Sequence, residues 1–416
     1  AEASGRTRDR AASASFDLLA EIRRRSEVVS TLGLSAALLQ EYLDSGYTDW
    51  LVQADKHTLT VRTLYYLTTL TRAFALASAA SGQSPQKLLD YLRQVNALPA
   101  VSGDAKRLAQ QASAIKLANF FGWSVQEVRE CVSRIDADGI LKNLSQLDLL
   151  MRVLTLSTAT GMDALTIFLI GNLPETVDKS SYAKAAEHAL LGESSAQAPI
   201  VHEPGDVTGL VTMTCEVVDN STVVANKPGE KVTYKVTLKD SNGEPLSGVT
   251  VHWRATLGTI KDDTTLIDGT LVAEFIPGNV MGHDTPLLWL DLFEPQYAPS
   301  IEITADFATL FFPLEELSPT PLDTVEYGHE VELYAVLEDA YGNRGQNSLV
   351  EWFWTIEAPA KRDAVTIRPA QGFTDQQGLT RVFVSSRTGG TFVFSVRTQS
   401  GESERIFTNA ITFARS

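Results

Sequence analysis

The sequence is poor in cysteine, since its 416 residues contain only Cys131 and Cys215. They fall in stretches that we assign below to different domains, so we expect neither a disulfide framework nor a cysteine-based metal site. Long apolar runs are also missing. The most apolar stretch, 149–173, contains Arg152 and Asp163. It falls short of the roughly 18 uninterrupted apolar residues of a membrane helix, so we expect no transmembrane segment.

The sequence also has no surplus of basic residues, because 35 Lys and Arg are outnumbered by 51 Asp and Glu, for a net charge of −16. The negative charge is unevenly distributed: residues 1–199 contain 20 basic and 21 acidic side chains, and residues 200–416 contain 15 basic and 30 acidic ones. Phosphate groups are bound by Lys and Arg, so we expect no nucleic-acid partner. The one basic run, Arg23 to Arg25, is typical of a solvated helix face, with a partner contact as the alternative.

The sequence also lacks the motifs G-x-S-x-G, H-E-x-x-H, G-x-G-x-x-G, C-x-x-C and the phosphate loop. Two pairs of neighbouring residues, Asp262-Asp263 and His283-Asp284, offer ligands to a divalent ion, but we interpret them as solvated loop charge. We therefore predict that the chain is not an enzyme and has no catalytic, cofactor-binding or metal-binding residues and no cofactor; binding residues stay unknown. The histidines are scattered with no i, i+4 pair, at His57, His188, His202, His252, His283 and His329.

A glycine followed two residues later by Ser or Asp recurs through the first half. Glycine adopts the left-handed conformation that ends a helix, and the Ser or Asp side chain caps the next helix. Each corner therefore joins a longer helix to a shorter one, and we expect the longer helices at about 60–80, 104–121 and 144–160. The four corners are Gly33 to Ser35, Gly82 to Ser84, Gly122 to Ser124 and Gly161 to Asp163.

A single corner followed by a basic recognition helix would indicate a DNA-binding helix-turn-helix. Here four corners recur, and the helices behind them are apolar or acidic. This pattern favours helical repeats that stack to share one core.

The second half is different, because Val, Thr and Ile alternate with polar residues in short runs typical of strands. It repeats itself with a period of 99 residues, the size of an immunoglobulin-like (Ig-like) sandwich. Later in each copy, Gly269 corresponds to Gly378. The recurring residues are Gly229, Val232, Leu238, Asp240, Gly243, Val251 and Trp253, which return as Gly328, Val331, Leu337, Asp339, Gly342, Val350 and Trp352.

Local features of the repeat predict its core and one turn. Trp253 and Trp352 should fill the space between two sheets rather than form a ligand platform, and Trp354 should face the same side as Trp352. The run 240–243 ends in Asn-Gly and predicts a hairpin turn between alternating strands.

Residues 278–326 are rich in proline and large apolar side chains. We interpret them as the last strands of the first sandwich followed by an interdomain joint. Three aromatic residues there, Phe293, Tyr297 and Phe312, should pack against a neighbouring domain rather than form a binding patch.

Together these patterns predict a multidomain chain, α then β, with an N-terminal all-α bundle of helical-pair repeats and C-terminal tandem Ig-like β-sandwiches. The small, polar start is typical of a frayed terminus or of the cut edge of a longer chain. The expected boundaries are a flexible N-terminus at 1–15, a helical repeat domain at 16–192, a linker at 193–208, and Ig-like sandwiches at 209–310 and 311–416.

The helical half resembles the α-helical shell of the A component of bacterial insecticidal toxin complexes. The resemblance is carried by LGLSAALLQEYL (32–43), ANFFGWSVQEV (118–128) and LSQLDLLMRVLTLSTATGMDALTIFLI (144–170). Members of that family form large pentamers that bind a host surface, form a pore and translocate a toxic enzyme carried by partner subunits. The resemblance implies a scaffold role for this chain, without the pore or the toxic activity.

The β half resembles the bacterial Ig-like domains of invasin and intimin. The resemblance is carried by TLKDSNGEPLSGVTVHW (237–253) and VLEDAYGNRGQNSLVEWFW (336–354), which share a Val-rich strand, Asp-x-x-Gly and a strand with an aromatic residue. Such modules are implicated in receptor contact.

Together the two resemblances imply a secreted or bacterial cell-surface virulence protein. As a non-enzymatic toxin-complex component, its partners would be other toxin subunits or a host-surface receptor, protein or glycan, and the full-length protein would be a homo-oligomer. The alternative is a bacterial cell-surface adhesin in which the Ig-like domains form a stalk.

Overall fold

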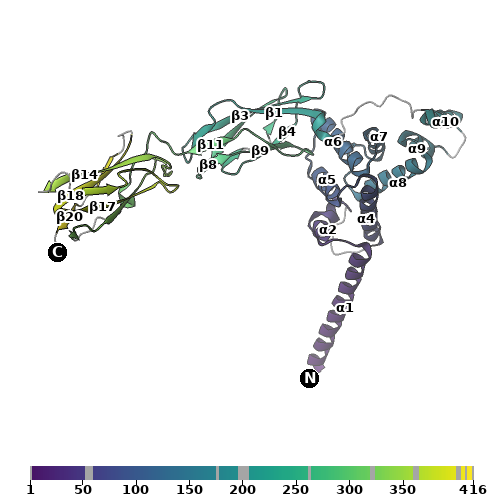
Figure 1. Cartoon of the computed structure of the whole chain (residues 1–416). Helices are drawn as coiled ribbons and strands as arrows, with labels where there is room; N and C mark the ends of the chain where they lie inside the picture. The colour runs from purple at the N-terminus through teal and green to yellow at the C-terminus, as the bar shows by residue number, and fades with distance from the viewer. Residues whose placement is uncertain are drawn as a thin grey trace.

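The computed structural model describes residues 2–51, 60–174, 178–194, 206–260, 264–318, 324–358, 365–399, 404–407 and 410–414. Three bodies follow one another in a row (Figure 1), and we name them the helical unit, the first sandwich and the second sandwich. The predicted fold class, α then β with tandem Ig-like sandwiches, is confirmed.

The helical unit is built on the four predicted corners. Their glycines have φ angles of 62° to 71°, and the Ser or Asp after each accepts an N–H from the first turn of the next helix. The expected longer helices are present as α4, α6 and α8. The helices are α1 (Glu2–Leu32), α2 (Ala36–Glu41), a π-helical turn (Tyr42–Gly46), α3 (Tyr47–Asp49), α4 (Val61–Ser81), α5 (Pro85–Ala97), α6 (Gly103–Phe121), α7 (Val125–Ile135), α8 (Leu144–Thr160), α9 (Ala164–Gly171) and α10 (Lys179–Ser194).

The N-terminal segment, for which we expect flexibility, is helical. Residues 2–15 belong to α1, which projects away from the rest of the helical unit (Figure 1). The physical reason is that 1–32 contains no proline and a single glycine, Gly5, among strong helix formers such as Ala, Arg and Glu.

No single described helix is long and apolar enough to cross a membrane. Helices α8 and α9 together meet the length and composition, but they bend by 105° at the break between them.

The first sandwich packs the sheet β1-β3-β7-β5 against the sheets β10-β9-β4-β6 and β2-β11-β8. Trp253 is 4% exposed and packs on Tyr234 of the facing sheet, with ring centroids 5.5 Å apart, so its predicted core position is confirmed. The strands are β1 (Val211–Val217), β2 (Thr222–Val224), β3 (Val232–Asp240), β4 (Thr250–Arg254), β5 (Gly258–Ile260), β6 (Thr264–Thr265), β7 (Thr270–Pro277), β8 (Gly282–Asp284), β9 (Leu287–Leu290), β10 (Gln296–Tyr297) and β11 (Ile301–Thr304).

The second sandwich packs β13-β17-β15 against β12-β20-β18-β14-β16, with β19 paired to β18. Trp352 is 3% exposed and donates from Nε1 to Thr380 Oγ1 at 3.1 Å, and Trp354 packs edge-on against Phe392. Trp352 is therefore a core residue, as predicted, and Trp354 is half-buried and packs against the same core. The strands are β12 (Val325–Glu326), β13 (Val331–Val336), β14 (Leu349–Ala358), β15 (Val365–Arg368), β16 (Gln371–Phe373), β17 (Leu379–Ser386), β18 (Gly390–Thr398), β19 (Glu404–Ile406) and β20 (Ile411–Ala414).

One turn of the 99-residue repeat has the same backbone geometry in both copies. In both copies the glycine of Asp-x-x-Gly has a positive φ, 86° at Gly243 and 81° at Gly342, and donates its N–H to the Asp carbonyl. The predicted tight turn at 240–243 is present, closed by an antiparallel bridge between Lys239 and Pro245, but the flanking strands β3 and β4 lie in different sheets. The turn instead starts a crossing from one layer of the sandwich to the other.

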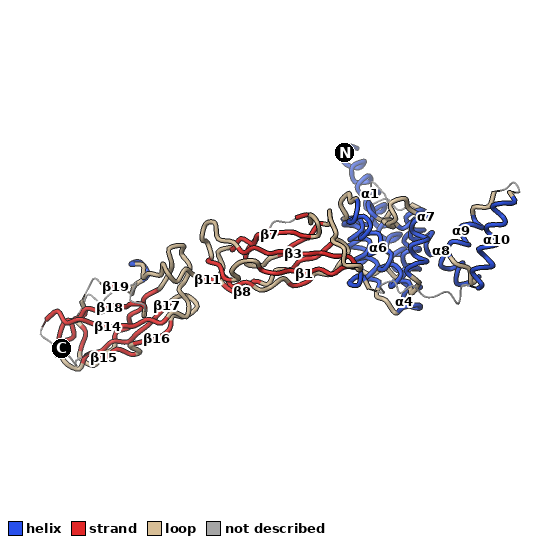
Figure 2. Tube along the Cα trace, turned by 90° about the horizontal axis from the view of Figure 1, so that it is seen from above, coloured by secondary structure: helices blue, strands red, loops and turns tan. Residues whose placement is uncertain are grey.

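The helical unit and the first sandwich share a single contiguous core. A 3₁₀ turn, Val207–Leu210, packs on α6, and the half-buried Phe293 contacts the same cluster. Lys116 of α6 lies at this junction, 4.0 Å from Glu294, and burial lowers the pKa of its ammonium group. The second sandwich has a separate core, and seen from above the bodies again lie along one line (Figure 2).

Candidate functional site: an interdomain joint and an aromatic face

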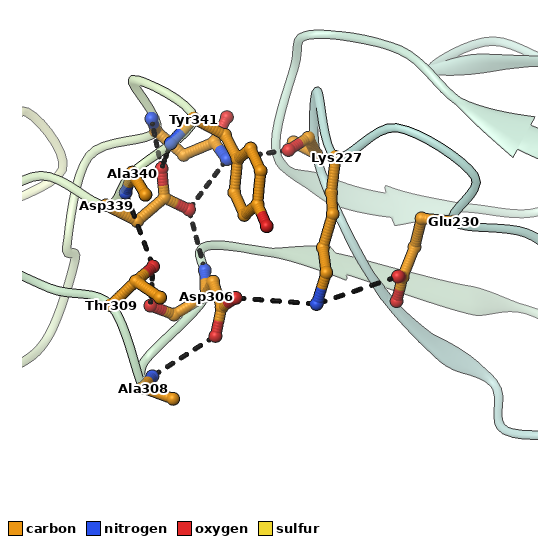
Figure 3. A network of polar contacts seen from close by, with 10 residues as sticks. Lys227, Glu230, Asp306, Ala308, Thr309, Asp339, Ala340 and Tyr341 are labelled. Atoms are coloured by element: carbon orange, nitrogen blue, oxygen red, sulfur yellow. Dashed lines mark hydrogen bonds and ion pairs between the residues drawn. The ribbon is translucent and has the colours of Figure 1, made fainter.

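A buried carboxylate, Asp339, lies where the two sandwiches meet (Figure 3). It is 1% exposed, and its Oδ1 accepts the N–H groups of Tyr341 and Asn343, each at 2.8 Å. Its Oδ2 accepts the N–H of Asp306, which follows β11 of the first sandwich, at 2.7 Å. Burial alone would raise the pKa of Asp339, but the donors from Asp306, Asn343 and Tyr341 outweigh it and hold that pKa below its usual range.

A buried amide completes the contact. Asn343 is 4% exposed, and its Nδ2 donates to the carbonyl of Ala225 at 2.7 Å and to Asp339 Oδ2 at 2.8 Å. Asn226 donates to Asn343 Oδ1 at 3.4 Å. Because Ala225 and Asn226 follow β2, a single side chain of the second sandwich bonds to two residues of the first.

Lys227 makes further contacts at the surface of the same joint. Its Nζ lies 3.4 Å from Asp306 Oδ2 and 3.8 Å from Glu230 Oε2, and it stands 5.9 Å from the ring centroid of Tyr341 (Figure 3). All of these charges are partly exposed, and ion pairs in water contribute little. The buried Asp339 and Asn343 are therefore the groups that fix the joint.

In the first sandwich the corresponding turn, 240–243, lies at the end that contacts the helical unit. Just after that turn the N–H of Ser247 donates to Asp104 Oδ2 of α6 at 3.1 Å, and Asp104 pairs with Arg107 at 3.1 Å. The turn carboxylate itself, Asp240, is more solvated than Asp339; N–H donors, Glu244 first, lower its pKa. Each sandwich thus uses the same end to contact the body that precedes it.

A second feature is the outer face of β4, β9 and β10. His252 lies opposite Trp289 with stacked rings 5.6 Å apart, and its Nε2 is 2.8 Å from Asp291 Oδ1. Arg254 is exposed, and Tyr297 is 77% exposed. Both lie opposite Leu287, which is two residues before Trp289 and therefore on the same side of β9. Aromatic rings beside a carboxylate, an imidazole and a guanidinium offer both apolar and hydrogen-bonding contacts to a ligand. We name Trp289, Tyr297, His252, Asp291 and Arg254 the aromatic face.

Of the two residue pairs considered for an ion, the structure describes only His283 and Asp284. Asp262 and Asp263 lie outside the described residues. His283 is exposed, whereas Asp284 is 1% exposed and accepts the N–H groups of Thr256 and Leu257 at 2.9 and 2.6 Å. Within the described parts of the chain, no group of three or more His, Cys, Asp or Glu side chains is placed to hold a metal ion.

The three aromatic residues expected at interdomain contacts have different environments. Phe293 packs against the core shared with the helical unit, and Phe312 is 3% exposed inside the core of the second sandwich. Tyr297 is exposed instead, so the prediction that it packs on a neighbouring domain is wrong. Strand β10 lies at the edge of its sheet, where nothing in the described chain covers the ring of Tyr297.

Sequence patterns missed the joint, although one signal was present. At the position of Asn343 the first copy has Glu244. An amide can both donate to a neighbouring carbonyl and accept from a neighbouring amide, whereas an ionised carboxylate can only accept. The exchange of an acid for an amide beside a repeated Asp-x-x-Gly thus marks the copy whose turn is buried.

Comparison with solved structures finds likeness to the Ig-like domains of invasin- and intimin-type bacterial adhesins. The Yersinia pseudotuberculosis adhesin InvE is 20% identical with a TM-score of 0.32, over 49% of this chain and 60% of InvE. Invasin, described as a bacterial integrin-binding protein, is 20% identical with a TM-score of 0.36, over 50% of this chain and 42% of invasin. A tandem pair of titin Ig domains gives 11% and 0.29, over 50% of this chain and 98% of the pair.

The matches to InvE and invasin span less than two thirds of those chains. Identities and TM-scores this low assign no function. No protein-family model and no curated protein matches the chain. Nothing in these comparisons supports the resemblance of the helical half to the toxin-complex A component.

Proposed function

We propose that this chain is a non-catalytic attachment module of the bacterial cell surface, of the adhesin type. In this proposal the helical unit and the first sandwich form one base, the second sandwich extends it, and the aromatic face contacts a host-surface molecule. The observation that carries the proposal is the joint at Asp339 and Asn343, because buried, directional hydrogen bonds between domains keep two modules in a fixed orientation.

A fixed orientation matters for attachment. A flexible linker lets each domain rotate freely, and ordering it on binding costs conformational entropy. The described chain instead joins its bodies by a shared core at one junction and by buried polar contacts at the other. This preorganisation suits a protein that presents a surface to a partner more than one that closes around a substrate.

The chemistry of the aromatic face supports a polar ligand with apolar patches, such as a glycan or a protein loop. Tyr297 and Trp289 offer ring faces, while Asp291, His252 and Arg254 offer acceptors and donors. Tyr, Trp and Arg are also the side chains enriched at the energetic centres of protein interfaces.

The toxin-complex function has no observation in the structure to favour it. Its carrying motif is the Gly-x-Ser corner, and here each corner is explained by a left-handed glycine and a helix cap. Any bundle of antiparallel helices uses the same devices. The adhesin alternative therefore becomes the main proposal.

The test is binding of the full chain to a glycan array and to cultured cell surfaces. We expect saturable binding by the native chain and a loss of at least about tenfold in affinity, some 1.4 kcal/mol, for the double variant Trp289→Ala with Tyr297→Ala. The matched control is Phe373→Ala, which removes a 64% exposed ring from the second sandwich and should leave binding unchanged.

Two outcomes count against the proposal in different ways. Absence of saturable binding on any surface would reject the attachment function. Saturable binding that the double variant leaves intact would keep attachment and reject the aromatic face as its site.

A further inference from the structure

A groove runs between helices α6 and α7 of the helical unit. Its volume is about 510 Å³, within the range of roughly 300 to 1,000 Å³ that is usual for small-molecule sites. Ala114 of α6 and Val132 of α7, each 2% exposed, supply its apolar bottom. The methyl group of Ala114 does not reach across to α7, so the space between the two helices stays open here.

The walls of the groove carry groups that form hydrogen bonds in both directions. Gln111 of α6 and Gln126 of α7 line it, together with the hydroxyl group of Ser133. Among the described residues neither of these two carboxamides has a hydrogen-bond partner. A carboxamide has both donors and an acceptor, as a sugar hydroxyl does, so the two kinds of group can pair in either direction.

One end of the groove is fixed by the loop that follows α7. Gln110 Nε2 donates to the carbonyl of Asp138 at 2.8 Å, and Asp138 Oδ1 pairs with Lys106 Nζ at 2.9 Å. Gly139 has a φ of 70°, and a Cβ atom there would lie 2.8 Å from Gln110 Nε2, so this close approach depends on glycine. The wall is therefore in place before a ligand arrives, which reduces the entropic cost of binding.

The charge that lines the groove is positive. Arg107 of α6 and Arg129 of α7 lie on opposite walls, and the lining carboxylate of Glu130 is held by Arg134 at 2.6 Å. Arg107 also pairs with Asp104 at 3.1 Å, but its side chain is 56% exposed. Guanidinium groups are well suited to bind a carboxylate, because each offers several N–H donors in a planar fork. The groove therefore favours an anion over a metal ion or another cation.

The charge of the whole chain limits the size of that anion. Its net charge of −16 repels a long polyanion. A single carboxylate, in contrast, needs only the local pair of arginines. A purely apolar ligand fits poorly as well, because it would leave the polar walls without hydrogen-bond partners.

We propose that this groove binds a sugar acid, a hydroxylated ring that carries one carboxylate. The carboxylate lies between Arg107 and Arg129, and the ring hydroxyls bond to Gln111 and Gln126. An apolar face of the ring rests on the bottom of the groove. The same chemistry occurs in a free sugar acid and in the terminal residue of an acidic glycan. This site lies in the helical unit and is separate from the aromatic face of the first sandwich.

The test is a saturation-transfer NMR titration of the full chain with three probes. Glucuronate has ring hydroxyls and a carboxylate, glucose has the hydroxyls alone, and acetate has the carboxylate alone. We expect glucuronate to bind at least about tenfold more tightly than either simpler probe. Absence of glucuronate binding would overturn the proposal, and so would equal affinity for glucuronate and one of the simpler probes.

A substitution at Arg129 tests whether the ligand lies in this groove. Arg129→Gln removes one guanidinium from the exposed surface of α7 and should weaken glucuronate binding at least about tenfold. The matched control is Arg23→Gln, because Arg23 is 82% exposed on α1 and lies outside the groove. It should bind glucuronate as the native chain does, and circular dichroism checks that both variants stay helical. Glucuronate binding that Arg129→Gln leaves intact would reject the groove as the site.

Two further measurements separate the source of the ligand and the two proposed sites. Equal binding of the methyl glycoside of glucuronic acid would support the proposal with a glycan terminus as the ligand, and binding of the free acid alone would support it with a free sugar acid. The double variant Trp289→Ala with Tyr297→Ala should bind glucuronate as the native chain does. Failure of the attachment function and failure of this site are therefore distinguishable.

Discussion

The junction between the helical unit and the first sandwich is mainly apolar, whereas the junction between the two sandwiches is mainly polar. The helical unit and the first sandwich merge their apolar cores, with the turn Val207–Leu210 and Phe293 between them. The two sandwiches have separate cores, and they meet through the buried Asp339 and Asn343, with Met281 packed against both cores. An apolar junction tolerates small shifts because dispersion and burial are not directional, whereas a buried polar junction is stable only in the one geometry that satisfies every donor and acceptor.

The comparison also shows how one turn serves two environments. The Asp-x-x-Gly turns around Asp240 and Asp339 have the same backbone hydrogen bonds. Only the second is closed over by its neighbour, and there an amide, Asn343, replaces Glu244. The amide of Asn343 thus supplies an interdomain hydrogen bond that a carboxylate at the equivalent position could not donate.

The largest effects should come from the tryptophans, and they test whether the first core is continuous. Trp253→Ala and Trp352→Ala each remove a buried ring and should cost roughly 3 to 5 kcal/mol. Because Trp253 belongs to the core shared with the helical unit, its loss should lower the unfolding midpoint of the helices together with that of the first sandwich. Calorimetry combined with far-ultraviolet circular dichroism separates the transitions.

Trp352→Ala is the matched control for this experiment, because it should destabilise the second sandwich alone. If the helical signal keeps its midpoint in Trp253→Ala while the first sandwich unfolds early, the two bodies are separate folding units and the shared core does not couple them.

An intermediate effect should come from the buried carboxylate of the joint. Asp339→Ala leaves the N–H groups of Asp306, Tyr341 and Asn343 without their acceptor and should cost at least about 2 kcal/mol, since a single hydrogen bond to a charged group is worth roughly 1.5 to 3 kcal/mol. Denaturant unfolding measures the loss, and small-angle X-ray scattering should show a broader range of interdomain angles.

Asp240→Ala removes the equivalent side chain from the more solvated turn and is the internal control, with a much smaller loss and an unchanged scattering profile. Equal effects of the two substitutions would mean that Asp339 serves its own turn and not the joint.

The smallest and most gradual effect should be that of acid. The folded pKa of Asp339 lies below the ordinary Asp value of about 3.9, so its contribution to stability is present above that value and is lost as the pH falls through the folded pKa. Scattering recorded from neutral to strongly acidic pH should show the sandwiches losing their fixed angle in that window. In Asp339→Ala the profile should change far less with pH, and an identical acid response in both proteins would assign it to other carboxyl groups.

Much of the architecture was predictable because it depends on local rules. A glycine that ends a helix and a serine that caps the next are chosen by backbone geometry, so Gly82 and Ser84 were readable from the sequence. Trp253 and Trp352 were equally readable, because a large ring on an alternating strand has few places to lie except between two sheets.

Properties that depend on a neighbour were not predictable. The local difference between the two turns, Asn343 in place of Glu244, gains its meaning only when the first sandwich is placed over Asp339. The turn expected at 240–243 is present, but the strands on either side of it do not pair with each other, because the turn type is local while the sheet that receives the next strand is not. Tyr297 was expected to be covered, and only the sheet order places it at an open edge.

The terminal strands of each sandwich have a mechanical consequence. In the first sandwich β2, near its entry, runs parallel to β11, after which the chain leaves toward the second; β12 and β20 pair in the same parallel sense. Pulling the two ends of the chain apart would slide each pair lengthwise, so that its hydrogen bonds carry the load together instead of opening one after another. Under flow or traction, this arrangement makes the sandwiches resist extension.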